Sequence, residues 1–179
     1  MSSLLKTKKN ATGITIRFAI SKCSLGLVLV AASEKGICAV LLGDDAKALA
    51  ANLADRFPQV RLVDADLDLK RKIEAIIALI EAPGRSLDLA LDLQGTDFQK
   101  SVWQALREIP LGSTASYSEV ARALGIPQAV RSVARACAAN PVAVVIPCHR
   151  VLRADGHLSG YRWGVERKRA LLKREMPTG

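Results

Sequence analysis

The residues from Ser116 to Val151 are SYSEVARALGIPQAVRSVARACAANPVAVVIPCHRV, which is two short helical patterns followed by a cysteine. The first pattern covers Ser118–Leu124 and ends at Gly125. The second covers Pro127–Ala139, where proline suits the first turn of a helix. Two short helices joined by a glycine turn predict a helix-turn-helix. A helical hairpin buried in a core has the same pattern, so the pattern alone leaves DNA binding open.

The second predicted helix is unusual because most of its side chains are small. The small residues are Ala129, Ser132, Ala134, Ala136, Ala138 and Ala139. Small side chains let a helix backbone approach a DNA groove closely. The long side chains are Arg131 and Arg135, and an arginine on such a helix could enter the duplex and fill a vacated base position. In the alternative interpretation, both arginines only contact phosphate.

Basic charge is concentrated in the same half of the chain. The whole sequence has a net charge of +9. Residues 1–96 contain 13 basic and 11 acidic residues, a net of +2, whereas residues 97–179 contain 13 basic and 6 acidic residues, a net of +7. Clustered arginine favours binding to nucleic acid, because phosphates attract it. A solvated basic surface is the alternative.

The segment Pro147-Cys148-His149-Arg150 contains the residues of an activated thiol. A thiolate is a strong nucleophile, and a nearby imidazole or guanidinium lowers the pKa of a thiol. A carboxylate would be needed to orient the histidine, and Glu166 and Glu175 are the candidates. The alternative is that Cys148 is a buried structural cysteine, as most buried cysteines are.

The remaining cysteines, Cys23, Cys38 and Cys137, form no C-x-x-C pair. The sequence also has only two histidines, neither at ligand spacing from a cysteine pair. We therefore expect reduced thiols, no disulfide framework and no metal. No apolar run is long enough to span a bilayer, and basic Met1–Asn10 lacks the apolar core of a signal peptide. We expect a flexible N-terminus and a cytoplasmic protein.

Hydrophobic periodicity predicts an α+β fold with two domains, 1–94 and 95–179. The N-terminal domain should be a small antiparallel sheet with helices, and the C-terminal domain mainly helical. The strands are expected at Ile14–Ile20, Leu25–Ala31 and Ile37–Leu42, and the helices at Ala46–Phe57, Leu69–Glu81, Asp97–Ile109 and Glu166–Glu175. The alternating segment Ser86–Leu93 is expected to be a strand or an extended linker.

Several motifs together resemble the O6-alkylguanine-DNA alkyltransferases, the methylated-DNA–protein-cysteine methyltransferase family. The matching stretches are Gly36–Asp45, Gly95–Gln99 with Val102-Trp103, Ser116-Tyr117, Arg131–Val133, Asn140–Val142, Ile146–Val151 and Ser159–Gly164. They extend over most of the chain. The resemblance is strongest to members that form the C-terminal part of longer bacterial regulators, and it implies a ribonuclease H-like N-terminal domain.

The resemblance implies a role for each matching residue. Cys148 matches the alkyl acceptor, His149 the base that works through a water, Glu175 the carboxylate that orients it, and Asn140 the brace of the turn. Tyr117, Ser159, Gly160 and the carbonyls of Cys148 and Val151 match the groups that hold the flipped guanine. Arg131 matches the arginine that replaces the flipped nucleotide, with Ala129, Ser132 and Arg135 beside it on the DNA.

The function implied by the resemblance is direct repair of O6-methylguanine, and of O4-methylthymine, by irreversible transfer of the alkyl group to Cys148. It also implies docking of a monomer in the minor groove of double-stranded DNA, with no cofactor. The alternatives are a fragment that acts in a transcriptional response to alkylation and a binder without catalysis. Ala143 and Leu158 stand where some members have proline and tyrosine, so the range of alkyl groups stays open.

Overall fold

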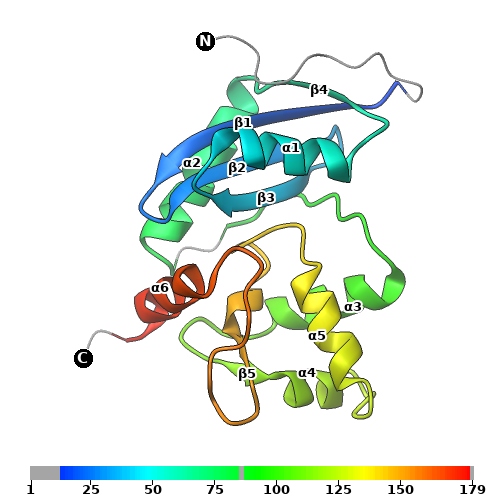
Figure 1. Cartoon of the computed structure of the whole chain (residues 1–179), viewed down its shortest axis with the longest axis vertical. Helices are drawn as coiled ribbons and strands as arrows, with labels where there is room; N and C mark the ends of the chain where they lie inside the picture. The colour runs from blue at the N-terminus through cyan, green and yellow to red at the C-terminus, as the bar shows by residue number, and fades with distance from the viewer. Residues whose placement is uncertain (1–12, 85–86, 178–179) are drawn as a thin grey trace. The chain divides into compact units, whose positions relative to one another are not determined.

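The computed structural model describes residues 13–84 and 87–177 (Figure 1). The expectation for Met1–Asn10 lies outside these residues. The chain forms two compact units, one made of residues 13–81 with 87–93 and the other of residues 82–84 with 94–177. The division into domains 1–94 and 95–179 stays a prediction. None of the helices in the described ranges has the length and apolar character that a membrane crossing requires.

The first unit contains a four-stranded sheet in the order β3-β2-β1-β4. Strands β1 (Thr15–Cys23), β2 (Gly26–Ala32) and β3 (Ile37–Gly43) pair as the antiparallel meander that the sequence predicts. Strand β4 (Arg61–Asp64) was not predicted, and it pairs in parallel with β1, so the sheet is mixed. Four residues are too few to show an alternating pattern, which is why periodicity misses this strand.

Two helices complete the first unit. Helix α1 (Ala46–Arg56) begins after Asp45, whose carboxylate accepts a hydrogen bond of 2.7 Å from the backbone N–H of Ala48. Helix α2 (Leu67–Glu81) packs against β1 and β2. Residues 87–93 are extended rather than part of a regular strand, and Leu91 forms an isolated bridge with Ile37.

The second unit is mainly helical, as predicted. Its elements are α3 (Asp97–Arg107), β5 (Ala115–Ser116), α4 (Tyr117–Ala123), α5 (Val130–Ala138), the 3₁₀ helix η1 (Cys148–Arg150), β6 (Val151–Leu152) and α6 (Val165–Glu175). Helices α4 and α5 pack together across the turn at 124–129, in the order that a helix-turn-helix requires. Helix α5 begins three residues later than Pro127, because Ile126 and Ala129 form a hydrogen-bonded turn first.

Candidate active site

Two tight turns deliver Cys148 to the start of η1. In the first, the N–H of Val145 donates to the carbonyl of Ala143 at 2.7 Å, and Val144 between them has a φ of +69°. A β-branched residue is strained there, by about 1–3 kcal/mol. In the second, the N–H of Cys148 donates to the carbonyl of Ile146 at 2.8 Å around Pro147. The proline ring holds φ at −81°, which suits this inverse γ-turn.

Asn140 braces both turns from the end of α5. Its side chain is fully buried, and its Oδ1 accepts a hydrogen bond of 2.9 Å from the N–H of Val142. Its Nδ2 donates to the carbonyl of Ile146 at 2.9 Å and to Cys148 Sγ at 3.2 Å. One amide therefore links the helix end, the turn and the thiol.

The thiol of Cys148 is buried, with only 6% of the residue exposed. Burial raises its pKa to about 11, although the hydrogen bond from Asn140 and the charge of Lys168 act in the opposite direction. The thiol is therefore protonated at neutral pH, contrary to the lowered pKa that the Pro-Cys-His-Arg motif suggested. A base is needed to remove its proton.

His149 is fully buried, and its Nε2 lies 2.8 Å from Glu175 Oε1 on α6. Arg150 holds the same carboxylate, with its Nε 2.9 Å from Oε2 and its Nη2 2.9 Å from Oε1. Burial opposes ionisation of Glu175, but the hydrogen bonds from His149 and Arg150 lower the pKa of its carboxyl to about 2. Glu166, the other candidate carboxylate, pairs with Arg169 instead.

The geometry leaves one nitrogen of the imidazole available as a base. An ionised Glu175 accepts the Nε2 hydrogen, so in the neutral ring Nδ1 has a free lone pair. Nδ1 is buried and has no hydrogen-bond partner among the described residues. Burial lowers the pKa of His149 in spite of the bond to Glu175, so the ring is neutral at pH 7.

Lys168 is a residue of this site that the sequence analysis missed. Only 1% of it is exposed, and its Nζ lies 2.6 Å from the carbonyl oxygen of Val151 and 2.8 Å from Ser159 Oγ. Ser159 Oγ in turn lies 2.6 Å from the hydroxyl of Tyr117. A signal for Lys168 was available, because it is three residues before Leu171 and so lies on the buried face of α6.

A pocket of about 220 Å³ opens on the thiol. It is lined by Tyr117, Ala134, Cys137, Ala138, Cys148, Gly160, Tyr161, Arg162 and Trp163. Two features of its lining were not predicted. The thiol of Cys137 faces the pocket, and burial raises its pKa to about 12. The hydroxyl of Tyr161 is buried without a partner among the described residues, so it is a donor available to a ligand.

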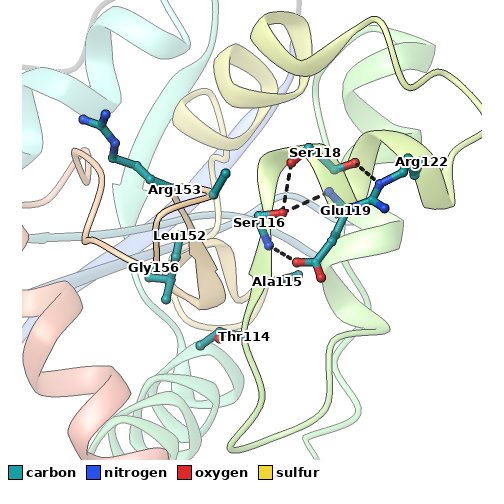
Figure 2. A pocket seen from close by; sticks show the side chains of 10 residues that line it. Thr114, Ala115, Ser116, Ser118, Glu119, Arg122, Leu152, Arg153 and Gly156 are labelled. Carbon is teal, nitrogen blue, oxygen red and sulfur yellow. Dashed lines mark hydrogen bonds between the residues drawn. The ribbon is translucent and has the colours of Figure 1, made fainter.

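A second pocket, of about 320 Å³, is lined in part by strands β5 and β6 themselves and is shown in Figure 2. Hydroxyl groups of Thr114, Ser116 and Ser118 line it. Arg122 and Arg153 stand on opposite sides of it, and both are exposed (Figure 2). The carboxylate of Glu119, at its edge, accepts a hydrogen bond from the N–H of Ser116 and caps α4.

The residues expected to meet DNA lie on or beside α5. Arg131, Ser132 and Arg135 are exposed on the helix, and Ala129 precedes its first turn and is half-buried. The Nε1 hydrogen of Trp103 on α3 donates to the carbonyl of Ala136 at 2.8 Å, which fixes the helix from behind. In the ranges that the structure describes, no cluster of His, Cys, Asp and Glu could hold a metal ion.

Comparison with known proteins gives matches over both units. A family model described as 6-O-methylguanine DNA methyltransferase, DNA binding domain, matches residues 97–177. The chain is 53% identical over 162 residues to the bifunctional transcriptional activator/DNA repair enzyme Ada of Escherichia coli K12, covering 90% of this chain and 46% of Ada. It is 39% identical over 158 residues to a Methanosarcina acetivorans methylated-DNA–protein-cysteine methyltransferase, covering 88% and 97%.

Solved structures agree with these matches. Mycobacterium tuberculosis OGT in complex with DNA has a TM-score of 0.72 and 32% identity, over 92% of this chain and 96% of that one. The chain spans about half the length of the two Ada proteins that it matches, from Escherichia coli and Salmonella typhimurium.

Proposed function

The chain belongs to the methylated-DNA–protein-cysteine methyltransferase family, and from this membership we propose that it repairs O6-alkylguanine in DNA by taking the alkyl group onto Cys148. The observation that carries the proposal is the thiol of Cys148, which lines a pocket and accepts a hydrogen bond from Asn140. The next residue in the chain is His149, which is paired with Glu175. The reaction class is displacement at carbon by sulfur. The DNA is the alkyl donor, so no cofactor is required.

Access to the alkyl group requires base flipping. An O6-alkyl group lies on a base edge inside the duplex, and an enzyme that acts on a base must take it out of the stack. In our proposal α5 enters the minor groove, where its small side chains allow close approach. Arg131 occupies the position that the base leaves, and Arg135, Ala129 and Ser132 contact the DNA beside it.

The flipped guanine is held by groups around the pocket. The carbonyls of Cys148 and Val151 accept from its amine, while Tyr117 and the Ser159-Gly160 loop contact the edge that carries the alkyl group. The carbonyl of Val151 already accepts from Lys168. A carbonyl oxygen has two lone pairs, so it can accept from the guanine amine as well.

His149 supplies the base that the buried thiol needs. Its Nδ1 takes the proton of Cys148 through a bridging water, and Glu175 stabilises the imidazolium that forms. Sγ then bonds to the alkyl carbon as the bond from that carbon to the guanine oxygen breaks. Guanine leaves with the electron pair and takes up one proton, so the alkyl group and the thiol hydrogen exchange places. The thioether product is stable, so each chain reacts once.

Intact-mass spectrometry after incubation with duplex DNA containing O6-methylguanine tests this function. We expect the chain to gain one methyl group in place of one hydrogen. Cys148→Ala should abolish the gain while DNA binding persists, and Cys137→Ala, which removes the other thiol of the pocket, should retain it. An unchanged mass with folded, reduced protein would refute the proposal. Duplex DNA containing O4-methylthymine, run in parallel, tests the second substrate.

A second candidate function is transcriptional regulation in response to alkylation. It is favoured by the match to half of Ada, which is named a transcriptional activator as well as a repair enzyme. A binder that lacks catalysis is disfavoured by the presence of Cys148 at the acceptor position. We further propose that the protein acts as a monomer in the cytoplasm. Sedimentation with and without DNA tests the oligomeric state.

A further inference from the structure

The cation of Lys168 is buried beside the acceptor pocket without a carboxylate partner among the residues that the structure describes. Its partners are the neutral oxygens of Val151 and Ser159. A buried charge is costly unless it is paired and hydrogen-bonded, and such groups are common at functional sites. Burial lowers the pKa of Lys168, while the nearby thiols of Cys148 and Cys137 act in the opposite direction.

Lys168 fixes the direction of the hydrogen bonds that lead to the pocket. An ammonium group has three donors and no acceptor, so Ser159 Oγ must accept from it. The hydroxyl hydrogen of Ser159 is then free to point to Tyr117, whose oxygen lies 2.6 Å away. If Tyr117 accepts this bond, its own hydrogen is left to point into the pocket that it lines.

We propose that Lys168 is a positioning residue that makes Tyr117 a hydrogen-bond donor to the leaving guanine, through the chain Lys168–Ser159–Tyr117. This inference rests on the proposed function. Donation to the guanine stabilises the negative charge that it acquires as the bond to the alkyl carbon breaks. Because the hydroxyl hydrogen of Ser159 is committed to Tyr117, its backbone N–H is the donor left for the guanine oxygen.

The chain can be tested by a double-mutant cycle on methyl transfer from free O6-methylguanine base, which removes the contribution of DNA binding. Lys168→Met should slow the transfer by about 10–100-fold. This loss is at or below that for complete removal of one well-placed donor, because Tyr117 itself is still present. In the Tyr117→Phe background, Lys168→Met should change the rate by less than about twofold, because the chain is already broken. Lys173→Met, on the same helix but exposed, is the control.

A second readout separates this role from an effect on the thiol. Iodoacetamide alkylates Cys148 with loss of iodide, which needs no proton donor. Its rate at Cys148, followed by peptide mass mapping, should therefore fall much less than the rate of methyl transfer in Lys168→Met, because only the effect of the Lys168 charge on the thiol is lost. Equal slowing of methyl transfer in both backgrounds, or an equal fall in the iodoacetamide rate, would overturn the proposal.

If Lys168→Met does not fold, Ser159→Ala breaks the same chain and should show the same dependence on Tyr117. Equal slowing by Ser159→Ala with and without Tyr117→Phe would overturn the proposal in the same way. Absence of any methyl uptake by the unsubstituted chain would instead refute the proposed function itself.

Discussion

The two pockets of the second unit share one strand ladder but have opposite chemistry. Strands β5 and β6 pair in parallel, with Ala115 opposite Val151 and Ser116 opposite Leu152. The acceptor pocket uses the residues that flank the ladder, Tyr117 after β5 and Cys148 before β6, and its functional groups are largely buried. The second pocket is lined by the ladder itself and has exposed arginines at its sides (Figure 2).

The difference shows how burial changes the value of a charge. In the acceptor pocket the low dielectric raises the pKa of the thiol to about 11, so the chemistry depends on a few oriented hydrogen bonds. In the second pocket water screens the exposed arginines, so each should contribute little by itself, and we expect each to act only by attracting a phosphate of the DNA. Substitutions in the first pocket should therefore affect transfer, and substitutions in the second should affect binding.

The largest effect is expected from His149→Asn. Without the base, the thiol proton must leave unaided, and loss of general base catalysis slows reactions by about 10²–10⁴-fold. Single-turnover mass spectrometry gives the transfer rate, and fluorescence anisotropy gives the affinity for damaged duplex DNA, which should not change. A parallel loss of affinity would contradict the division of roles between the two pockets.

The pH dependence of transfer should change form in the same variant. The thiol of Cys148 is protonated below pH about 11, and burial lowers the pKa of His149, so its ring is neutral above the ordinary histidine pKa. The reactive protonation state is thus constant from about pH 6.5 to 9, and the rate should be nearly flat. In His149→Asn the rate should follow the thiolate fraction and rise about tenfold per pH unit. Equal slopes in the two proteins would show that His149 is not the base.

Arg131→Ala should have an effect that is smaller than that of His149→Asn and larger than that of substitutions in the second pocket. If the arginine fills the position of the flipped base, its loss should slow repair of duplex DNA on the order of tenfold, since flipping costs a few kcal/mol. Transfer from free O6-methylguanine base should be unchanged. The same loss with both substrates would remove Arg131 from the flipping role, and Arg135→Ala provides the comparison on the same helix.

The smallest effects are expected from Arg122→Ala and Arg153→Ala in the second pocket. If each contacts one phosphate, each should weaken duplex binding about threefold to tenfold and reduce the salt dependence of binding by about one unit of slope. The transfer rate at saturating DNA should be retained. Arg107→Ala, an exposed arginine of α3, is the control, and an equal effect of that variant would indicate only a general loss of charge.

Hydrophobic periodicity was sufficient to predict the longer helices and strands. It was insufficient for features that depend on contacts between residues far apart in the sequence. Strands β1 to β3 and helix α3 follow from the hydrophobic pattern within each segment, which is a local signal. Local signals cannot choose between Glu166 and Glu175, because the choice depends on which turn of α6 meets His149. They also suggested an acidic thiol, whereas burial, which depends on the whole unit, raises its pKa.

Helix α6 carries Lys168 and Glu175 seven residues apart, on one face. In our proposals, Glu175 orients the base that receives the thiol proton, and Lys168 directs the donor to the departing guanine. Removal of the thiol proton and departure of guanine would therefore both depend on the same local equilibrium. That equilibrium is the packing of α6 against the rest of its unit. Local opening that releases α6 would separate Glu175 from His149 and Lys168 from Ser159. Amide hydrogen exchange across α6 would measure the free energy of that opening directly.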